Sequence, residues 1–77
     1  MAMVTSLVKD DRTARSAHPT RIEARYLTLE SDGNIVLQIN SYGSDTRDVP
    51  GKLSQTLQFD EHSARQLFDV LKKEFGF

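Results

Sequence analysis

Amide and hydroxyl side chains alternate along two stretches of this 77-residue chain, "NIVLQINSY" and "KLSQTLQF". These groups donate and accept hydrogen bonds without carrying a charge. Residues that alternate along a strand share one face of its sheet. A polar face with arginines and aromatic rings beside it suits hydrogen bonding and stacking with unpaired bases. The amide and hydroxyl side chains concerned are Gln38, Asn40, Tyr42, Ser54, Thr56 and Gln58, and the charged Lys52 shares their face.

Each type of side chain near this face has a distinct expected role. Amides would hydrogen-bond, tyrosines would stack on bases, and cations would neutralise phosphates. The alternative is a face that pairs with a second subunit or is simply solvated. The candidate nucleic-acid-binding residues are Arg21, Arg25, Tyr26, Gln38, Asn40, Tyr42, Arg47, Lys52 and Gln58.

The same sequence gives no sign of catalysis. It contains no cysteine, and its two histidines, His18 and His62, are far apart with no neighbouring ligand at metal spacing. Its glycines form no phosphate-binding or dinucleotide-binding motif. We therefore expect no enzyme, no metal site and no cofactor. The net charge of −1, from 10 basic and 11 acidic residues, also argues against strong non-specific binding to duplex DNA.

A hairpin and two further stretches must position the polar side chains. Asp32-Gly33 is a two-residue turn signal between β-rich runs. The first run mixes two phases, which predicts a β-bulge near residues 25–27. After the loop "GSDTRDVPG", the strictly alternating run "KLSQTLQF" predicts another strand. Residues 1–20 form either an N-terminal strand or a flexible arm, and residues 21–77 form a single sheet-plus-helix domain.

The C-terminal stretch "DEHSARQLFDVLKKEFGF" predicts a capped amphipathic helix. Asp60 is a suitable N-cap and Gly76 a suitable C-terminal stop. Ala64, Leu67, Phe68, Leu71 and Phe75 recur at helical spacing and form one apolar stripe. We expect this stripe to lie across the sheet and fill the core.

These elements predict an α+β fold, with an antiparallel sheet of three to four strands and one C-terminal helix packed across it (β-β-β-β-α). A chain this short buries only about 60% of its unfolded surface. Without disulfides or a metal, self-association is the expected source of further stability, so we predict a homodimer. No apolar run is long enough to cross a membrane and no signal peptide is visible, so we expect a cytoplasmic protein without a membrane partner.

The order of these pieces resembles the positive-cofactor-four family of single-stranded DNA-binding coactivators. The stretches "RYLTLESDGNIVLQINSYGSD", "VPGKLSQTLQF" and "DEHSARQLFDVLKKEF" carry the likeness over about residues 25–75. The resemblance implies dimerisation through helix and sheet, and a single-strand groove lined by Arg25, Tyr26, Gln38, Asn40 and Lys52. The family's strands and loops are basic, whereas this loop has only Arg47 and Lys52 against two aspartates. Pur-alpha-type repeats fit the same pattern.

Three functions remain open on the sequence. The first is a small non-enzymatic module that binds single-stranded nucleic acid along a sheet face. The second is a small protein–protein interaction factor, such as a phage- or mobile-element-encoded inhibitor that docks on a larger host complex. The third is a dimer that binds a small nucleotide between its subunits. The expected partner is therefore single-stranded nucleic acid or another protein.

Overall fold

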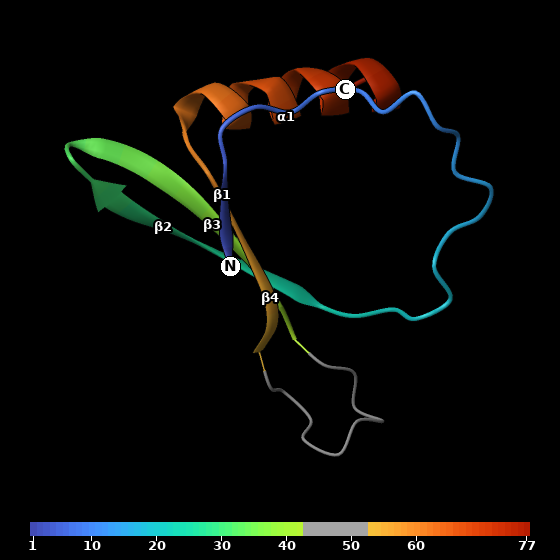
Figure 1. Cartoon of the computed structure of the whole chain (residues 1–77), viewed down its shortest axis with the longest axis horizontal. Helices are drawn as coiled ribbons and strands as arrows, with labels where there is room; N and C mark the ends of the chain where they lie inside the picture. Colours follow the sequence, from blue (N-terminus) through green and yellow to red (C-terminus); the bar gives the residue numbers. More distant parts are fainter. Residues whose placement is uncertain (43–52) are drawn as a thin grey trace.

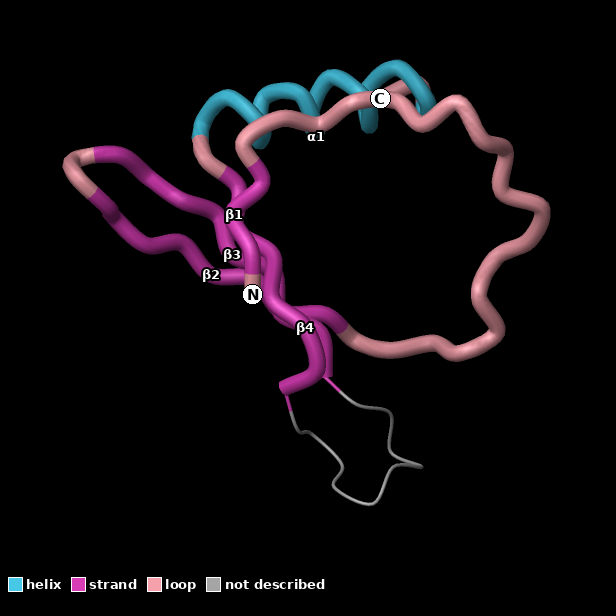
Figure 2. Tube along the Cα trace, in the orientation of Figure 1, coloured by secondary structure: helices cyan, strands magenta, loops and turns pink. Residues whose placement is uncertain are grey.

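Four strands and one helix make up the part of the chain that the structure, a computed structural model, describes, namely residues 1–42 and 53–77. The strands are β1 (Ala2–Val4), β2 (Ala24–Ser31), β3 (Asn34–Tyr42) and β4 (Leu53–Phe59), and the helix is α1 (Glu61–Phe75). The strands form one sheet in the order β1-β4-β3-β2, and α1 projects from one end of it (Figures 1 and 2). The predicted α+β class with a C-terminal helix is confirmed.

The sheet is mixed, which corrects the prediction of an antiparallel sheet. β2, β3 and β4 pair antiparallel in sequence order, but β1 pairs parallel with the end of β4, with Ala2 opposite Leu57 and Val4 opposite Phe59. β1 and β2 run in the same direction, and two such strands of one sheet require a long connection. Residues 5–23 provide it, because they carry the chain from β1 to β2 at the far edge of the sheet.

The hairpin turn is the one that its sequence predicts. Asp32 and Gly33 both have positive φ, 51° and 80°, as a two-residue type I′ turn requires. The pairing of β2 with β3 runs without interruption from Ser31 opposite Asn34 to Ala24 opposite Ser41. The predicted bulge near residues 25–27 is therefore wrong. A register shift occurs instead between β3 and β4, at Ser41 and Tyr42.

The ends of the helix also follow their sequence signals. Asp60 Oδ1 accepts a 2.9 Å hydrogen bond from the backbone N–H of Ser63. At the other end Gly76 adopts the left-handed conformation, with φ 72°, and donates its N–H to the Lys72 carbonyl at 3.0 Å. Both caps satisfy backbone groups that a helix terminus would otherwise leave without partners.

The helix does not lie across the sheet along its length, in contrast to the prediction. Its N-terminal end meets the sheet, and Ser63 there is completely buried. Toward its C-terminal end Phe68 is 58% exposed and Phe75 is 69% exposed. Only Asp60 separates β4 from α1, so the helix leaves directly from the end of the strand and points away from the sheet (Figure 1).

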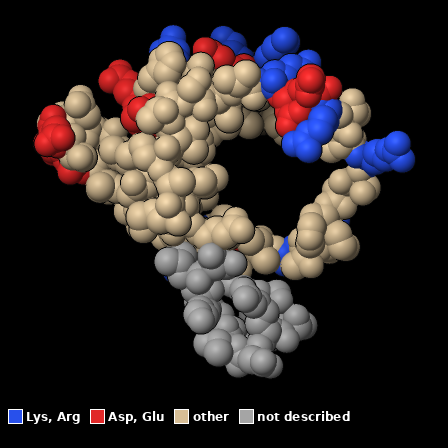
Figure 3. Space-filling view, viewed as in Figure 1, with Lys and Arg blue, Asp and Glu red and all other residues tan. Residues whose placement is uncertain are grey.

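The N-terminal segment fastens the start of the helix to the sheet. The Ser63 hydroxyl donates to the Val4 carbonyl at the end of β1. The backbone N–H of Leu7 donates to Gln66 Oε1 at 2.7 Å. Residues 5–23 then run along α1 and return in a wide arc to β2, with an opening between arc, helix and sheet that side chains do not fill (Figures 1 and 3). Residues 1–20 were predicted to form either a strand or an arm; they contain a short strand, β1, followed by a long loop.

Candidate binding face of the sheet

Strand register divides the described side chains of the sheet between two faces. Directly opposed residues of neighbouring strands share a face. We call one the polar face; its members on β2, β3 and β4 are Arg25, Leu27, Leu29, Ser31, Asn34, Val36, Gln38, Asn40, Thr56 and Gln58. We call the other the apolar face; its members are Ala24, Tyr26, Thr28, Glu30, Ile35, Leu37, Ile39, Ser41, Gln55, Leu57 and Phe59.

Four polar side chains form a connected hydrogen-bonded ladder on the polar face. Gln58 Nε2 donates to Gln38 Oε1 at 2.9 Å. Gln38 Nε2 in turn donates to Asn40 Oδ1 at 3.0 Å. The Thr56 hydroxyl donates to the same Asn40 oxygen at 2.8 Å. We call these four residues the amide ladder; it fixes the orientation of three amides across the two central strands.

The amide ladder is unusually well covered for side chains on a sheet face. Asn40 is 7% exposed and Thr56 is 5% exposed. In the described residues no buried side-chain nitrogen or oxygen lacks a hydrogen-bond partner. These hydrogen bonds matter for stability, because a buried polar group without a partner lowers the free energy of unfolding by about 1–3 kcal/mol. The ladder therefore has a structural role in the sheet as well as a place on its surface.

An apolar cluster adjoins the ladder toward the hairpin turn. Leu27 and Leu29 lie on the polar face, because β2 pairs them opposite Gln38 and Val36. Val36 is one of the two buried hydrophobic residues of the described chain. The mixed phase of the first run thus has a different cause from a bulge: β2 supplies apolar side chains to both faces.

The structure brings together only part of the predicted site. Arg25, Gln38, Asn40 and Gln58 share the polar face, with Arg25 directly opposite Asn40. Tyr26 lies on the opposite face beside Ile39, so it cannot stack on a ligand held by the ladder.

The remaining predicted site residues lie at the margins of the face or beyond the described residues. Tyr42 is half-buried at the end of β3, next to the register shift. Arg21 is exposed and precedes β2. Arg47 and Lys52 lie outside the described residues. Thr56 was not among the predicted site residues, although its alternation with Gln58 already placed it on this face.

Charge is sparse on the surface of the sheet. Charged side chains gather over the helix and at the tip of the hairpin, and the sheet surface seen in Figure 3 is almost free of them. Arg25 is the described cation on the polar face, and its guanidinium lies 3.6 Å from the Glu23 carboxylate in an exposed pair. Exposed pairs of this kind are weak, so the Arg25 side chain can exchange its partner readily.

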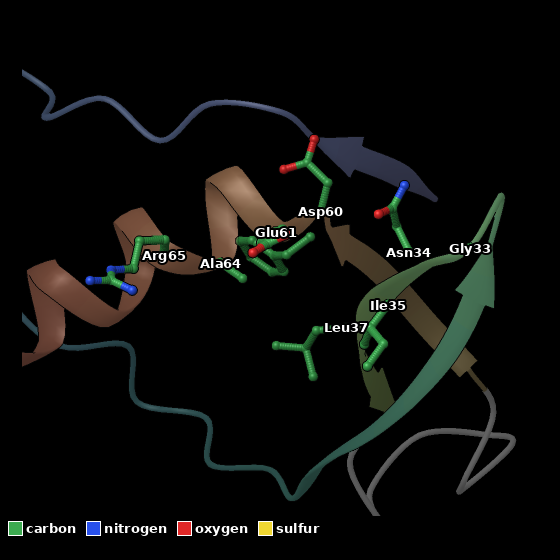
Figure 4. A pocket seen from close by; sticks show the side chains of 9 residues that line it. Gly33, Asn34, Ile35, Leu37, Asp60, Glu61, Ala64 and Arg65 are labelled. Carbon is green, nitrogen blue, oxygen red and sulfur yellow. The ribbon is translucent and has the colours of Figure 1, made fainter.

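A cleft of about 590 Å³ opens where the apolar face meets the start of α1 (Figure 4). Ile35, Leu37 and Phe59 form its sheet side, and Ala64 and Arg65 come from the helix. Ile35 at its mouth is 70% exposed, which is unusual for a large aliphatic side chain. The sequence places these residues on one face but contains no local signal that the helix leaves a cleft beside them.

Two acidic residues border this cleft at the helix N-terminus. Hydrogen bonds from the Ser63 backbone N–H, and then from its hydroxyl, hold the pKa of Asp60 below its usual value of 3.8. Asp60 and Glu61 both line the cleft, so its polar border is acidic on the side of the cap. Arg65 lines the same cleft, so its border carries charges of both signs.

Two kinds of site are not found in residues 1–42 and 53–77. In these ranges no three His, Asp or Glu side chains are grouped so that they could hold a metal ion. The same ranges contain no helix with the length and hydrophobicity that a membrane crossing requires.

Comparison of the chain with protein-family models, curated proteins and solved structures gives no match. The resemblance to the positive-cofactor-four family therefore stays a prediction.

Proposed function

We propose that this chain is a non-enzymatic module that binds single-stranded nucleic acid along the polar face of its sheet, and that it acts as a homodimer. The observation that carries the proposal is the amide ladder with Arg25 beside it. Gln38 and Gln58, the two half-exposed members of the ladder, each keep an amide N–H that the ladder does not use, and these groups can donate to the edges of unpaired bases. Arg25 next to them can neutralise a phosphate. The ladder already fixes the conformation of its side chains, so ligand binding loses little further side-chain entropy.

The scarcity of charge supports a single strand over a duplex as the ligand. Duplex binding rests on many phosphate contacts from lysines and arginines. Among the described residues of the polar face, Arg25 is the single cation. The face otherwise offers amides, a hydroxyl and the nearby ring of Tyr42. Stacking on an aromatic ring contributes about 1–3 kcal/mol per base and needs no base pair.

Fluorescence anisotropy with a labelled single strand of ~20 nucleotides at low and high salt tests this function. We expect binding that weakens as salt rises. Arg25→Ala should weaken it and lower the salt slope by about one, because one phosphate contact is lost. Arg15→Ala, which removes the same charge from the exposed N-terminal loop, is the matched control. Absence of binding at low salt, where electrostatic attraction is strongest, would exclude the proposal.

A protein-interaction factor is the second candidate, and the exposed apolar surface favours it. Ile35, Leu57 and Phe68 are all exposed in the single chain. A protein partner would bind through such anchors and tolerate moderate salt. Binding that is unchanged by salt and by Arg25→Ala, but lost on changing these anchors, would replace the nucleic-acid proposal with this one.

A further inference from the structure

The single chain exposes far more surface than a folded monomer of its mass. Its accessible surface is 6977 Å², whereas a compact monomer of 8.7 kDa exposes about 4,700 Å². Its radius of gyration is 14.6 Å, against about 11.5 Å for a compact chain of this length. Part of the difference belongs to the extended residues 5–23. The remainder includes large apolar side chains on the sheet and helix, which a partner must cover.

These apolar side chains form one continuous band. It begins on the apolar face with Ile35, Leu37 and Phe59, which line the cleft. Ala64 lines the same cleft from the helix and is the first residue of the helical stripe. From there the stripe continues through residues 67, 68, 71 and 75 along the side of α1. The band thus joins a hollow at one end of the helix to a large aromatic ring, Phe75, at the other.

Four of the five stripe residues are placed symmetrically about the middle of the stripe, whereas the fifth, Leu67, corresponds to Lys72. Ala64 and Phe75 lie equally far from the midpoint between Asp69 and Val70, and so do Phe68 and Leu71. In an antiparallel pair of identical helices related by a two-fold axis, residues placed in this way face one another. The small Ala64 then lies opposite the large Phe75, and Phe68 lies opposite Leu71. Small residues opposite large ones pack without voids.

We propose that a second copy of this chain covers the band. Each copy lays α1 antiparallel against α1 of the other and inserts Phe75 into the partner's cleft beside Ala64. The helix is about 22 Å long, so its two ends reach both clefts at once. The inference rests on the proposed homodimer and specifies its surface and register. It also leaves the polar face of each sheet outside the interface.

The area is sufficient for such a dimer. A stable interface of standard size removes about 800 Å² from each partner, and permanent homodimers remove more. An interface of that size would cover about 11% of the 6977 Å² that one chain exposes. The interface would be apolar in its centre, with the acidic cap residues at its margin, as permanent homodimers prefer.

Two aspartate substitutions on the same helix test the surface. Leu71→Asp places a charge in the stripe, whereas Val70→Asp places the same charge about 130° around the helix from the stripe's centre. Both side chains are partly exposed in the single chain, so both variants should keep their helical circular dichroism. Sedimentation velocity without nucleic acid should give twice the chain mass for the unaltered protein and for Val70→Asp. Leu71→Asp should give the mass of one chain.

Disulfide trapping tests the register. The chain has no cysteine, so engineered thiols react only with each other. Mixing an Ala64→Cys chain with a Phe75→Cys chain should yield mixed cross-linked dimers under mild oxidation. Each variant alone should remain uncross-linked, because equivalent residues lie about 16 Å apart along an antiparallel pair, beyond the reach of a disulfide. A parallel pair would cross-link each variant with itself instead.

The outcomes separate this inference from the proposed function. One-chain mass for the unaltered protein overturns the homodimer. A dimer that survives Leu71→Asp, or that cross-links only like with like, overturns the helix register while the homodimer stands. Neither experiment contains nucleic acid. A failure to bind single-stranded nucleic acid in the anisotropy experiment would therefore leave the conclusions on the homodimer and on the helix register unchanged.

Discussion

The two faces of the sheet reverse the usual relation between polarity and exposure. On the polar face Asn40 and Thr56 are almost completely covered, whereas Ile35 and Leu57 on the apolar face are exposed. The polar side chains are satisfied by one another through the amide ladder. Among the apolar side chains Phe59 is buried, but the projecting helix leaves Ile35 and Leu57 uncovered. This contrast is the reason why we propose a second copy as the cover of the apolar face, while the half-exposed Gln38 and Gln58 keep the polar face accessible to a ligand.

The largest effect should come from the residue that joins the sheet to the helix. Phe59→Ala removes a buried ring at the end of β4, which should lower the free energy of unfolding by about 3–5 kcal/mol. Urea denaturation at low protein concentration measures it. Val8→Ala, at an exposed side chain of the N-terminal loop, should change the same quantity by no more than about 0.5 kcal/mol. Equal losses would mean that the apolar face has no buried centre of its own.

Substitutions at two consecutive residues of β3 give the most direct comparison of how the two faces contribute to stability. Val36→Ala, on the polar face, should lower the free energy of unfolding by about 1.5–3 kcal/mol at every protein concentration. Ile35→Ala, on the apolar face, should have an effect that grows with protein concentration, since a second copy would bury that side chain. Thermal denaturation over a hundredfold concentration range distinguishes them. An Ile35→Ala effect independent of concentration would contradict the proposed interface.

A smaller effect should follow from shortening the amide ladder. Thr56→Val keeps the shape of the side chain but removes the hydroxyl that donates to Asn40. We expect a loss of about 0.5–1.5 kcal/mol in the free energy of unfolding, the usual net contribution of one hydrogen bond. Thr28→Val, at an exposed position of the apolar face, is the matched control and should be nearly neutral. If the two variants behave alike, the ladder does not stabilise the sheet.

The smallest effect should be a dependence of stability on pH from the helix cap. The pKa of Asp60 is lowered in the folded chain, so its contribution is present above its usual value of 3.8 and is lost as pH falls through the lowered value. Urea midpoints between pH 6 and pH 2.5 should therefore fall less for Asp60→Asn than for the unaltered chain. If the urea midpoint falls equally in both proteins, the pH dependence arises from another group, for example Asp10, whose pKa is lowered by its hydrogen bonds with Arg12.

Local features of the fold were predictable because they depend on residues a few positions apart. The Asp32-Gly33 turn, the Asp60 and Gly76 caps and the alternation that places Gln38, Asn40 and Gln58 on one face all follow from the sequence. The face that Tyr26 occupies could not be predicted, because β2 carries apolar residues on both faces and only its pairing with β3 sets their phase.

Sequence alone determined the turn, the helix ends and the polar composition of one face, since each depends on backbone preferences and spacing within a single element. Only the tertiary structure decided that β1 joins β4 in parallel, that Thr56 completes the ladder and that α1 projects from the sheet. Those features depend on contacts between segments far apart in the chain. Their formation requires that packing outweigh the entropy of closing long loops, a balance that no short window of residues contains.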